Sequence, residues 1–405
     1  MRRRRSSRLT RRPFFGLVGP RPKILLGLGA AAVGAGLLAL GFSGGWVGAT
    51  HLAAPKIAYT KGPPTPVKLK HVPPAPADLQ SDLERLAKGY GEPVGIAVTD
   101  VTTGWTASVD GNETFPQQSV SKLWVALSVM QAVDDHKLSL DQAVVLGPDD
   151  RSVFYQPMTR RIRGPNGYPT TLAELLRHAL IESDNAANDK LIAELGGAAT
   201  VTETIAAKGL SGLAVGGTER DVQTHTAGLT WKPEYGQTWI FKQARAALPD
   251  AVRDEALAAY LANPPDGATP NGIVTALAEL KRGQLLSRSS TDFMLELMGE
   301  ARTGVNRLRA GLSPGWALAH KTGTGPDWRG ASVGINDVGL LTAPDGRTYA
   351  VAVMIRQTSR PASARHAIMR NVTQAVARYW AAGLKDLPAE GRQTAQAAPE
   401  TAQGF

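Results

Sequence analysis

The sequence contains no cysteine. This absence excludes disulfide bonds, thiolate catalysis and zinc sites with cysteine ligands. It does not exclude export, because a chain of 405 residues can bury a core large enough to be stable without cross-links. The seven histidines form no closely spaced pair of the H-E-x-x-H type. We therefore expect neither a metal ion nor any other cofactor.

Acidic residues are absent from residues 1–23, which contain eight arginines and one lysine. These residues carry nine of the ten net positive charges, so the remainder of the chain carries about +1. A nucleic-acid-binding domain needs its basic charge on the folded surface. The distribution of charge therefore argues against a nucleic-acid partner.

Charge of either sign is absent from residues 24–47, a run of 24 residues that is long enough to cross a bilayer. The positive charges before it favour a cytoplasmic N-terminus and transfer of the rest across the membrane. Residues 10–15 (Thr-Arg-Arg-Pro-Phe-Phe) resemble a twin-arginine export signal, and residues 47–49 resemble a cleavage site. We predict a protein that is periplasmic or anchored to the inner membrane facing the periplasm.

Composition divides the chain into four parts. Residues 1–49 are predicted to be an export signal or an N-terminal membrane anchor, and the proline-rich residues 50–77 a semi-rigid linker. Residues 78–384 form the predicted catalytic domain. Residues 385–405 are rich in Ala, Gln and Glu without periodicity, which indicates a disordered tail.

Strand patterns occur near both ends of the predicted domain, and helical patterns dominate between residues 119 and 298. The strands are expected at 94–101, 105–109, 317–320, 333–341 and 349–355. This order predicts an α/β (α+β) domain: one antiparallel sheet assembled from both chain ends, flanked by helices, with a mostly helical lobe.

Ser119 and Lys122 precede an apolar run at residues 123–130. In a helix these two side chains share a face, so the lysine lies one turn from the serine hydroxyl. A lysine whose pKa is lowered by burial can accept the serine proton, and the helix N-terminus favours developing negative charge. A lone Ser-x-x-Lys pair is weak evidence, because it arises by chance about once in a chain of this length.

Two further tripeptides carry suitable groups. Ser183-Asp184-Asn185 offers a hydroxyl, a carboxylate and an amide, although the same residue types form ordinary helix caps. The segment Lys321-Thr322-Gly323-Thr324 ends a predicted strand. Its lysine and hydroxyls could bind a substrate carboxylate, while Gly323 would allow close approach to the backbone.

The order Ser-x-x-Lys, Ser-Asp-Asn, Lys-Thr-Gly resembles the penicillin-recognising serine enzymes, and within them the class A β-lactamases. The resemblance extends over residues 77–384. It includes Phe-Pro before Ser119, Ala-Thr-Pro at 268–270 and the run Thr-Gly-Val-Asn-Arg-Leu at 303–308. It implies a serine hydrolase, expected to be monomeric, that opens the β-lactam ring through an acyl-enzyme on Ser119.

Class A enzymes differ from their peptidase relatives in a glutamate that drives water onto the acyl-enzyme. Glu219 follows Ser183 by 36 residues, the separation that the family commonly uses. Glu234 lies in a Trp-Lys-Pro-Glu segment, where Lys232 would occupy the catalytic position. A lysine cannot take this role, so we favour Glu219 over Glu234, with a surface-loop acid as the structural alternative.

The resemblance implies roles for the remaining residues. Ser183 would pass a proton to the leaving nitrogen, and Asn185 would orient Lys122 and the substrate amide. The backbone N–H groups of Ser119 and Thr324 would form the oxyanion hole. The substrate carboxylate is expected to contact Lys321, Thr322, Gly323 and Thr324, with Arg329 as a further candidate and Tyr155 as a pocket wall.

Two alternatives stay open at this point. A D,D-peptidase acting on peptidoglycan stem peptides would use the same three motifs, and the leader and linker suit it equally well. A non-catalytic envelope protein is disfavoured by the intact nucleophile and both lysines. Residues 223–267 form a longer stretch than the family has at this place, and the sequence assigns them no role.

Overall fold

The computed structural model describes residues 71–385. The uncharged run at 24–47, the rest of the leader, most of the linker and nearly all of the tail lie outside this range. Among residues 71–385, no helix has both the length and the hydropathy needed to span a membrane.

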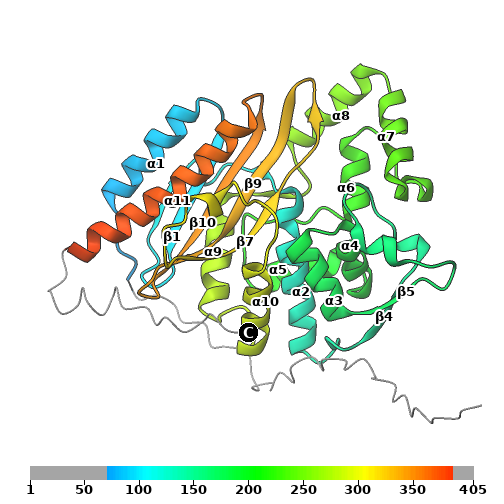
Figure 1. Cartoon of the computed structure of the whole chain (residues 1–405), viewed down its shortest axis with the longest axis horizontal. Helices are drawn as coiled ribbons and strands as arrows, with labels where there is room; N and C mark the ends of the chain where they lie inside the picture. Colours follow the sequence, from blue (N-terminus) through cyan, green and yellow to red (C-terminus); the bar gives the residue numbers. More distant parts are fainter. Residues whose placement is uncertain (1–70, 386–405) are drawn as a thin grey trace, which may run out of the picture. The chain divides into compact units, whose positions relative to one another are not determined.

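A six-stranded antiparallel sheet combines strands from both ends of the described chain (Figure 1). Its strands are β1 (Val94–Asp100), β2 (Thr106–Val109), β7 (Ala317–Gly323), β8 (Asp327–Trp328), β9 (Ala331–Thr342) and β10 (Thr348–Thr358). The order is β2-β1-β10-β9-β7, and β8 pairs with β9. The predicted fold class, an antiparallel sheet built from both chain ends and flanked by helices, is confirmed.

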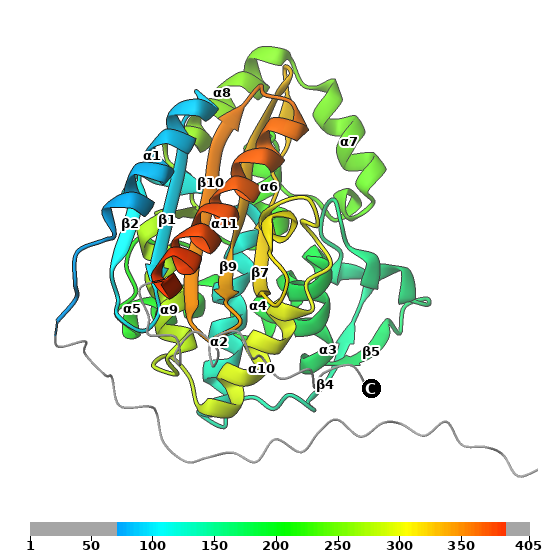
Figure 2. The same ribbon diagram turned by 60° about the vertical axis from the view of Figure 1, so that its left-hand side comes forward.

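Side chains alternate between two separate cores across this sheet. On β10, Val351, Val353 and Ile355 pack toward α1 (Ala77–Tyr90) and α11 (Ala362–Lys385). The intervening β10 residues are smaller on average and face the other core, which includes helix α9 (Pro270–Lys281). Figure 2 shows α1 and α11 side by side across one face, although they come from opposite ends of the domain. Helices therefore cover both faces, and every residue of β1 is buried.

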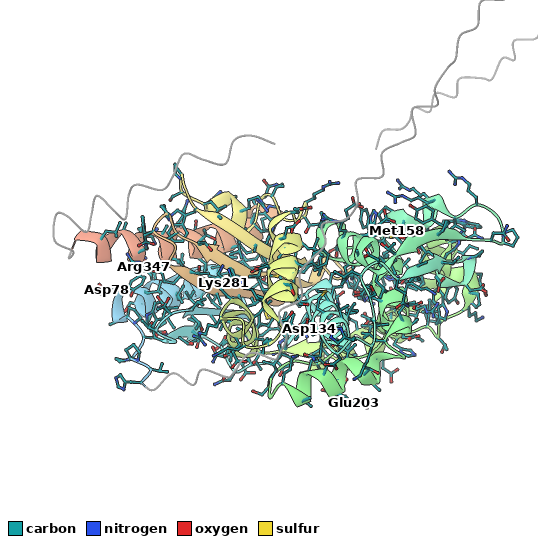
Figure 3. All side chains as sticks on the ribbon, turned by 90° about the horizontal axis from the view of Figure 1, so that it is seen from below. Asp78, Asp134, Met158, Glu203, Lys281 and Arg347 are labelled. Atoms are coloured by element: carbon teal, nitrogen blue, oxygen red, sulfur yellow. The ribbon has the colours of Figure 1, made fainter. Side chains whose placement is uncertain are left out.

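Helix α2 (Lys122–Asp134) forms the centre of the helical lobe and is buried on nearly all sides. Around it lie α3 (Leu172–Arg177), α4 (Asn185–Glu194), α5 (Ala198–Ala207), α10 (Arg288–Gly299) and the hairpin of β4 (Ala143–Leu146) and β5 (Tyr168–Thr171). Asp134, labelled in Figure 3, accepts hydrogen bonds from Ser287 and Ser290 at the start of α10. This contact fixes the far end of α2 to a segment distant in sequence.

The long stretch at 223–267, which the sequence left unassigned, contains two helices of its own. After α6 (Glu219–Thr226), a 3₁₀ turn (Pro233–Gly236) leads to α7 (Thr238–Ala247) and α8 (Asp250–Ala262), and the chain rejoins the domain at β6 (Gly267–Ala268). Figures 1 and 2 both show α8 above α6, beside the end of the sheet where β9 begins. We call residues 227–266 the inserted segment.

Candidate active site

Ser119 lies on a 3₁₀ turn (Gln118–Ser121) that leads directly into α2. The helix therefore begins three residues later than the sequence predicted, but the expected pairing is present. The Lys122 ammonium donates a hydrogen bond of 2.9 Å to the Ser119 hydroxyl oxygen. Lys122 is fully buried, so its charge depends on protein partners instead of water.

The second partner of Lys122 is Glu219, the first residue of α6. The Lys122 ammonium pairs with the Glu219 carboxylate, which is only 6% exposed. Glu219 lines the same cleft as Ser119. Glu234, the other candidate, is exposed on the 3₁₀ turn of the inserted segment and is not among the cleft-lining residues. Of the two glutamates, only Glu219 contacts the Ser119–Lys122 pair.

Asp189 of α4 holds the start of α6 in place. Its carboxylate accepts hydrogen bonds from the backbone N–H of Glu219 at 2.6 Å, the N–H of Arg220 at 3.2 Å and the Ser152 hydroxyl at 2.7 Å. Burial, reinforced by the nearby charge of Glu219, raises the pKa of Asp189 to about 7. Sequence reasoning missed this residue, although its position one helical turn after Asn185 places both on one face of α4.

The Ser-Asp-Asn segment is both a helix cap and part of the cleft. Ser183 has a left-handed backbone (φ 65°), and the Asp184 carboxylate caps α4 by accepting from the N–H of Ala187 at 2.9 Å. The Asn185 amide donates to the carbonyl of Val153 at 2.9 Å, and among residues 71–385 no hydrogen bond joins it to Lys122, which the resemblance expected it to orient. Its backbone N–H donates to the carbonyl of Tyr155, whose exposed ring borders the cleft.

Lys321 lies beneath the cleft surface. Its fully buried ammonium donates to the Ser183 hydroxyl at 2.9 Å, and burial together with the charge of Lys122 lowers its pKa well below the usual value. Thr322 and Thr324 line the cleft, whereas Lys321 and Gly323 do not. The close approach expected at Gly323 comes from the chain itself, because an added Cβ would meet the Gln117 carbonyl oxygen at 2.2 Å.

The cation beside the threonines is Arg307, which the sequence noted only within the run at 303–308. Arg307 lines the cleft and donates to the Thr324 hydroxyl at 2.6 Å and the Gly323 carbonyl at 2.9 Å. Arg329, the cation named from the sequence, follows β8 and pairs instead with Asp254 of α8 at 2.9 Å. Arg329 is not a cleft-lining residue.

The cleft encloses about 540 Å³ between the sheet and the helical lobe. Its lining includes Ser119, Tyr155, Ser183, Asn185, Glu219, Arg307, Thr322 and Thr324. Within residues 71–385, no cluster of three or more acidic or histidine side chains is arranged to bind a metal ion. The cleft therefore presents the Ser119 hydroxyl, the Glu219 carboxylate and the Arg307 guanidinium, with the Lys122 ammonium buried beside the first two.

A family model described as the beta-lactamase enzyme family matches residues 78–380. The chain belongs to this family. It is 26% identical to β-lactamase VEB-1 of Pseudomonas aeruginosa over 75% of this chain and 90% of that protein. With β-lactamase Toho-2 of Escherichia coli the identity is 30%, over 76% and 89% of the two chains. The sequence-based interpretation, a serine hydrolase of the β-lactamase family, is confirmed.

Solved structures agree with the fold. The crystal structure of a β-lactamase from Chitinophaga pinensis superposes with a TM-score of 0.61 and 27% identity, covering 76% of this β-lactamase and 99% of that chain. The TLA-3 extended-spectrum β-lactamase gives the same TM-score at 25% identity, over 75% and 98%.

Asp189 predicts a measurable pH dependence of stability. Its pKa is higher in the folded protein than in the unfolded chain, so the folded protein binds more protons between about pH 4 and pH 7. Its stabilising contribution is complete below the unfolded pKa and is lost as pH rises through about 7. Asp189→Asn, which cannot ionise, should flatten the decline in the free energy of unfolding over this range, measured by urea denaturation.

The exposed Asp292 on α10 provides the matched control, because Asp292→Asn should keep the parent slope. Asp266, whose pKa burial raises to about 6, contributes a slope of the same sign and remains in both variants. If the pH dependence of the free energy of unfolding is unchanged in Asp189→Asn, the raised pKa of Asp189 is contradicted.

Proposed function

We propose that Ser119 is the acylated nucleophile of this serine β-lactamase and that Lys122 and Glu219 are its proton acceptors. The carrying observation is the continuous contact from the Ser119 hydroxyl through the buried Lys122 ammonium to the Glu219 carboxylate, with Ser119 and Glu219 both lining one cleft. A serine hydroxyl is a weak nucleophile at neutral pH, and an adjacent base activates it.

In the acylation step, the Ser119 proton is removed either by Lys122, once its ammonium has passed a proton to the Glu219 carboxylate, or by a water held by Glu219. The serine oxygen attacks the lactam carbonyl carbon, and the carbonyl oxygen takes the negative charge. The backbone N–H groups of Ser119 and Thr324 stabilise that oxyanion.

Breaking the lactam C–N bond requires a proton on the leaving nitrogen. Ser183 is suited to deliver it, since its hydroxyl oxygen already accepts a hydrogen bond from Lys321 and its own hydrogen is free to point into the cleft. Lys321 thereby acts through Ser183. Asn185 acts on the cleft wall by fixing the backbone that carries Tyr155.

The substrate carboxylate is assigned to Arg307, Thr322 and Thr324. These side chains share one wall of the cleft, and the guanidinium is already oriented by its bond to Thr324. Arginine presents paired donors that match a carboxylate. In this assignment Arg307 takes the role that was expected of Arg329, which pairs with α8. Lys321 lies beneath the site.

Hydrolysis of the acyl-enzyme requires a water activated near the ester. Glu219 lines the cleft and is held by Asp189, which favours a base at a fixed position. A base at this position favours hydrolysis of the acyl-enzyme, and therefore turnover of β-lactams. A peptidase would instead form a stable adduct.

Ser119→Ala is expected to abolish covalent labelling by a fluorescent penicillin, because no hydroxyl remains to form the ester. Labelling is measured on denaturing gels, and the thermal unfolding midpoint checks that the fold survives. Labelling at the parent level would remove the whole mechanism.

Glu219→Ala is expected to acylate but to release product about 10²–10⁴-fold more slowly, since that is the typical contribution of general-base catalysis. Mass spectrometry over time should then show a penicilloyl adduct accumulating on Ser119. Glu234→Ala is the control and should hydrolyse penicillin like the parent. Stalling of Glu234→Ala with parent turnover by Glu219→Ala would reverse the assignment, and a parent that never deacylates would favour the peptidase.

We also propose that the protein is exported, with residues 1–49 as signal or anchor, 50–77 as linker, 78–384 as a monomeric catalytic domain and 385–405 as a tail. Nine positive charges preceding 24 uncharged residues support export.

The full-length protein should fractionate with the membrane or periplasm. Replacing Arg11 and Arg12 by Lys should block this only if export uses the twin-arginine route. Recovery of the intact parent from the cytosol would contradict the proposal.

A further inference from the structure

Helix α8 of the inserted segment places one face against parts of the domain that flank the nucleophile. Leu257 and Tyr260 form a buried cluster with Val222 of α6 and Val333 of β9. Asp254 stands one turn before Leu257 on the same face. The helix thus lies between α6 and the edge of the sheet, where the β8–β9 turn contacts it.

The N-terminal half of α8 is fastened to β8. The Arg253 guanidinium lies 3.2 Å from the centre of the Trp328 ring, and the Trp328 indole N–H donates to Asp254 at 2.7 Å. Arg329 donates to both carboxylate oxygens of Asp254 at 2.9 Å. Trp328 stands four residues after Thr324, so these contacts hold the segment that follows one proposed oxyanion donor.

The C-terminal half of α8 reaches the other donor. The Tyr260 hydroxyl donates to the Asp266 carboxylate at 2.8 Å and accepts from the Gln118 side-chain amide at 2.5 Å. Asp266 also accepts from the backbone N–H of Gln118 at 2.7 Å. All three residues are buried. Gln118 immediately precedes Ser119.

Gln118 needs such support because its backbone is left-handed. Its φ of 52° is unfavourable for a residue with a Cβ, and such a conformation persists only when its surroundings enforce it. The amide oxygen of Gln118 accepts from Gln223 at 2.8 Å. An added Cβ on Gly325 would meet its side chain at 3.0 Å, so Gln118 also packs against the residue that follows Thr324.

We propose that α8 is a brace for the oxyanion hole, with Tyr260 as a positioning residue that sets the Ser119 N–H relative to the Thr324 N–H. One end of the helix fixes β8, beyond Thr324, and the other fixes Gln118, before Ser119. This inference rests on the proposed function, because it assumes that these two N–H groups stabilise the oxyanion. It assigns to the inserted segment a role in catalysis that is separate from substrate contact.

Tyr260→Phe tests the brace by removing only the hydroxyl. The Gln118 amide and the Asp266 carboxylate then each lose a buried hydrogen-bond partner. Because Gln118 would be held less firmly, we expect the acylation rate constant to fall by about tenfold or more. The affinity for a boronic acid, which forms a tetrahedral adduct on Ser119, should fall by a similar factor. Binding of the intact lactam is measured in the Ser119→Ala background. There the dissociation constant should be the same with and without Tyr260→Phe.

Tyr235→Phe is the matched control. Tyr235 is a second buried tyrosine of the inserted segment, and within residues 71–385 its hydroxyl makes no hydrogen bond. This variant should acylate and bind the boronic acid like the parent. Equal losses in both variants, or a parallel loss of lactam binding, would overturn the proposal in favour of a general structural role. Parent values in Tyr260→Phe would overturn it directly.

If Tyr260→Phe fails to fold, a variant in the N-terminal half of α8 tests the proposal instead. Asp254 is partly exposed, so Asp254→Ala removes the oxygens that accept from Trp328 and Arg329 without opening the core. A drop in acylation and boronic-acid affinity at unchanged lactam binding supports the brace, and parent values overturn it. Failure of the proposed function looks different, because the parent itself would then neither acylate nor bind the boronic acid through Ser119.

Discussion

The buried ammonium of Lys122 is the constraint around which the site is built. Taking a charge out of water costs several kcal/mol unless it is paired and hydrogen-bonded. Here the partners are the Ser119 hydroxyl and the Glu219 carboxylate. Glu219 must in turn be held in place, and Asp189 does so through the backbone of α6. The reactive groups are therefore aligned by the same contacts that make the buried charge tolerable.

A second buried lysine extends this network across the boundary between lobe and sheet. Lys321 comes from β7, while Ser183, to which it donates, comes from the lobe. The nearby positive charge of Lys122 adds to burial in lowering the pKa of Lys321. A polar network in a low-dielectric interior is stable only when its members are satisfied. The geometry of the cleft therefore depends on the lobe and the sheet keeping their relative position.

The inserted segment shows how a long loop can acquire structure of its own. Two helices interrupt the connection between α6 and β6, and α8 returns apolar and polar side chains to the domain. Its contacts with β8 lie at the surface, whereas Tyr260 enters the buried network under the nucleophile. The residue before Ser119 and the strand after Thr324 thus contact the same helix.

The sequence by itself determined the fold class, the position of most strands of the main sheet near the two ends of the domain, and the serine hydrolase family. Periodicity and short motifs suffice for these, because they depend on residues close together in the chain. It also brought Ser119 beside Lys122, since one helical turn separates them. Only the tertiary structure decided that Glu219, not Glu234, reaches this pair, that Arg307 and not Arg329 lines the cleft, and that Asp189 and Tyr260 support the site. These contacts join residues from 16 to 142 positions apart, and no local pattern encodes which of these side chains meet.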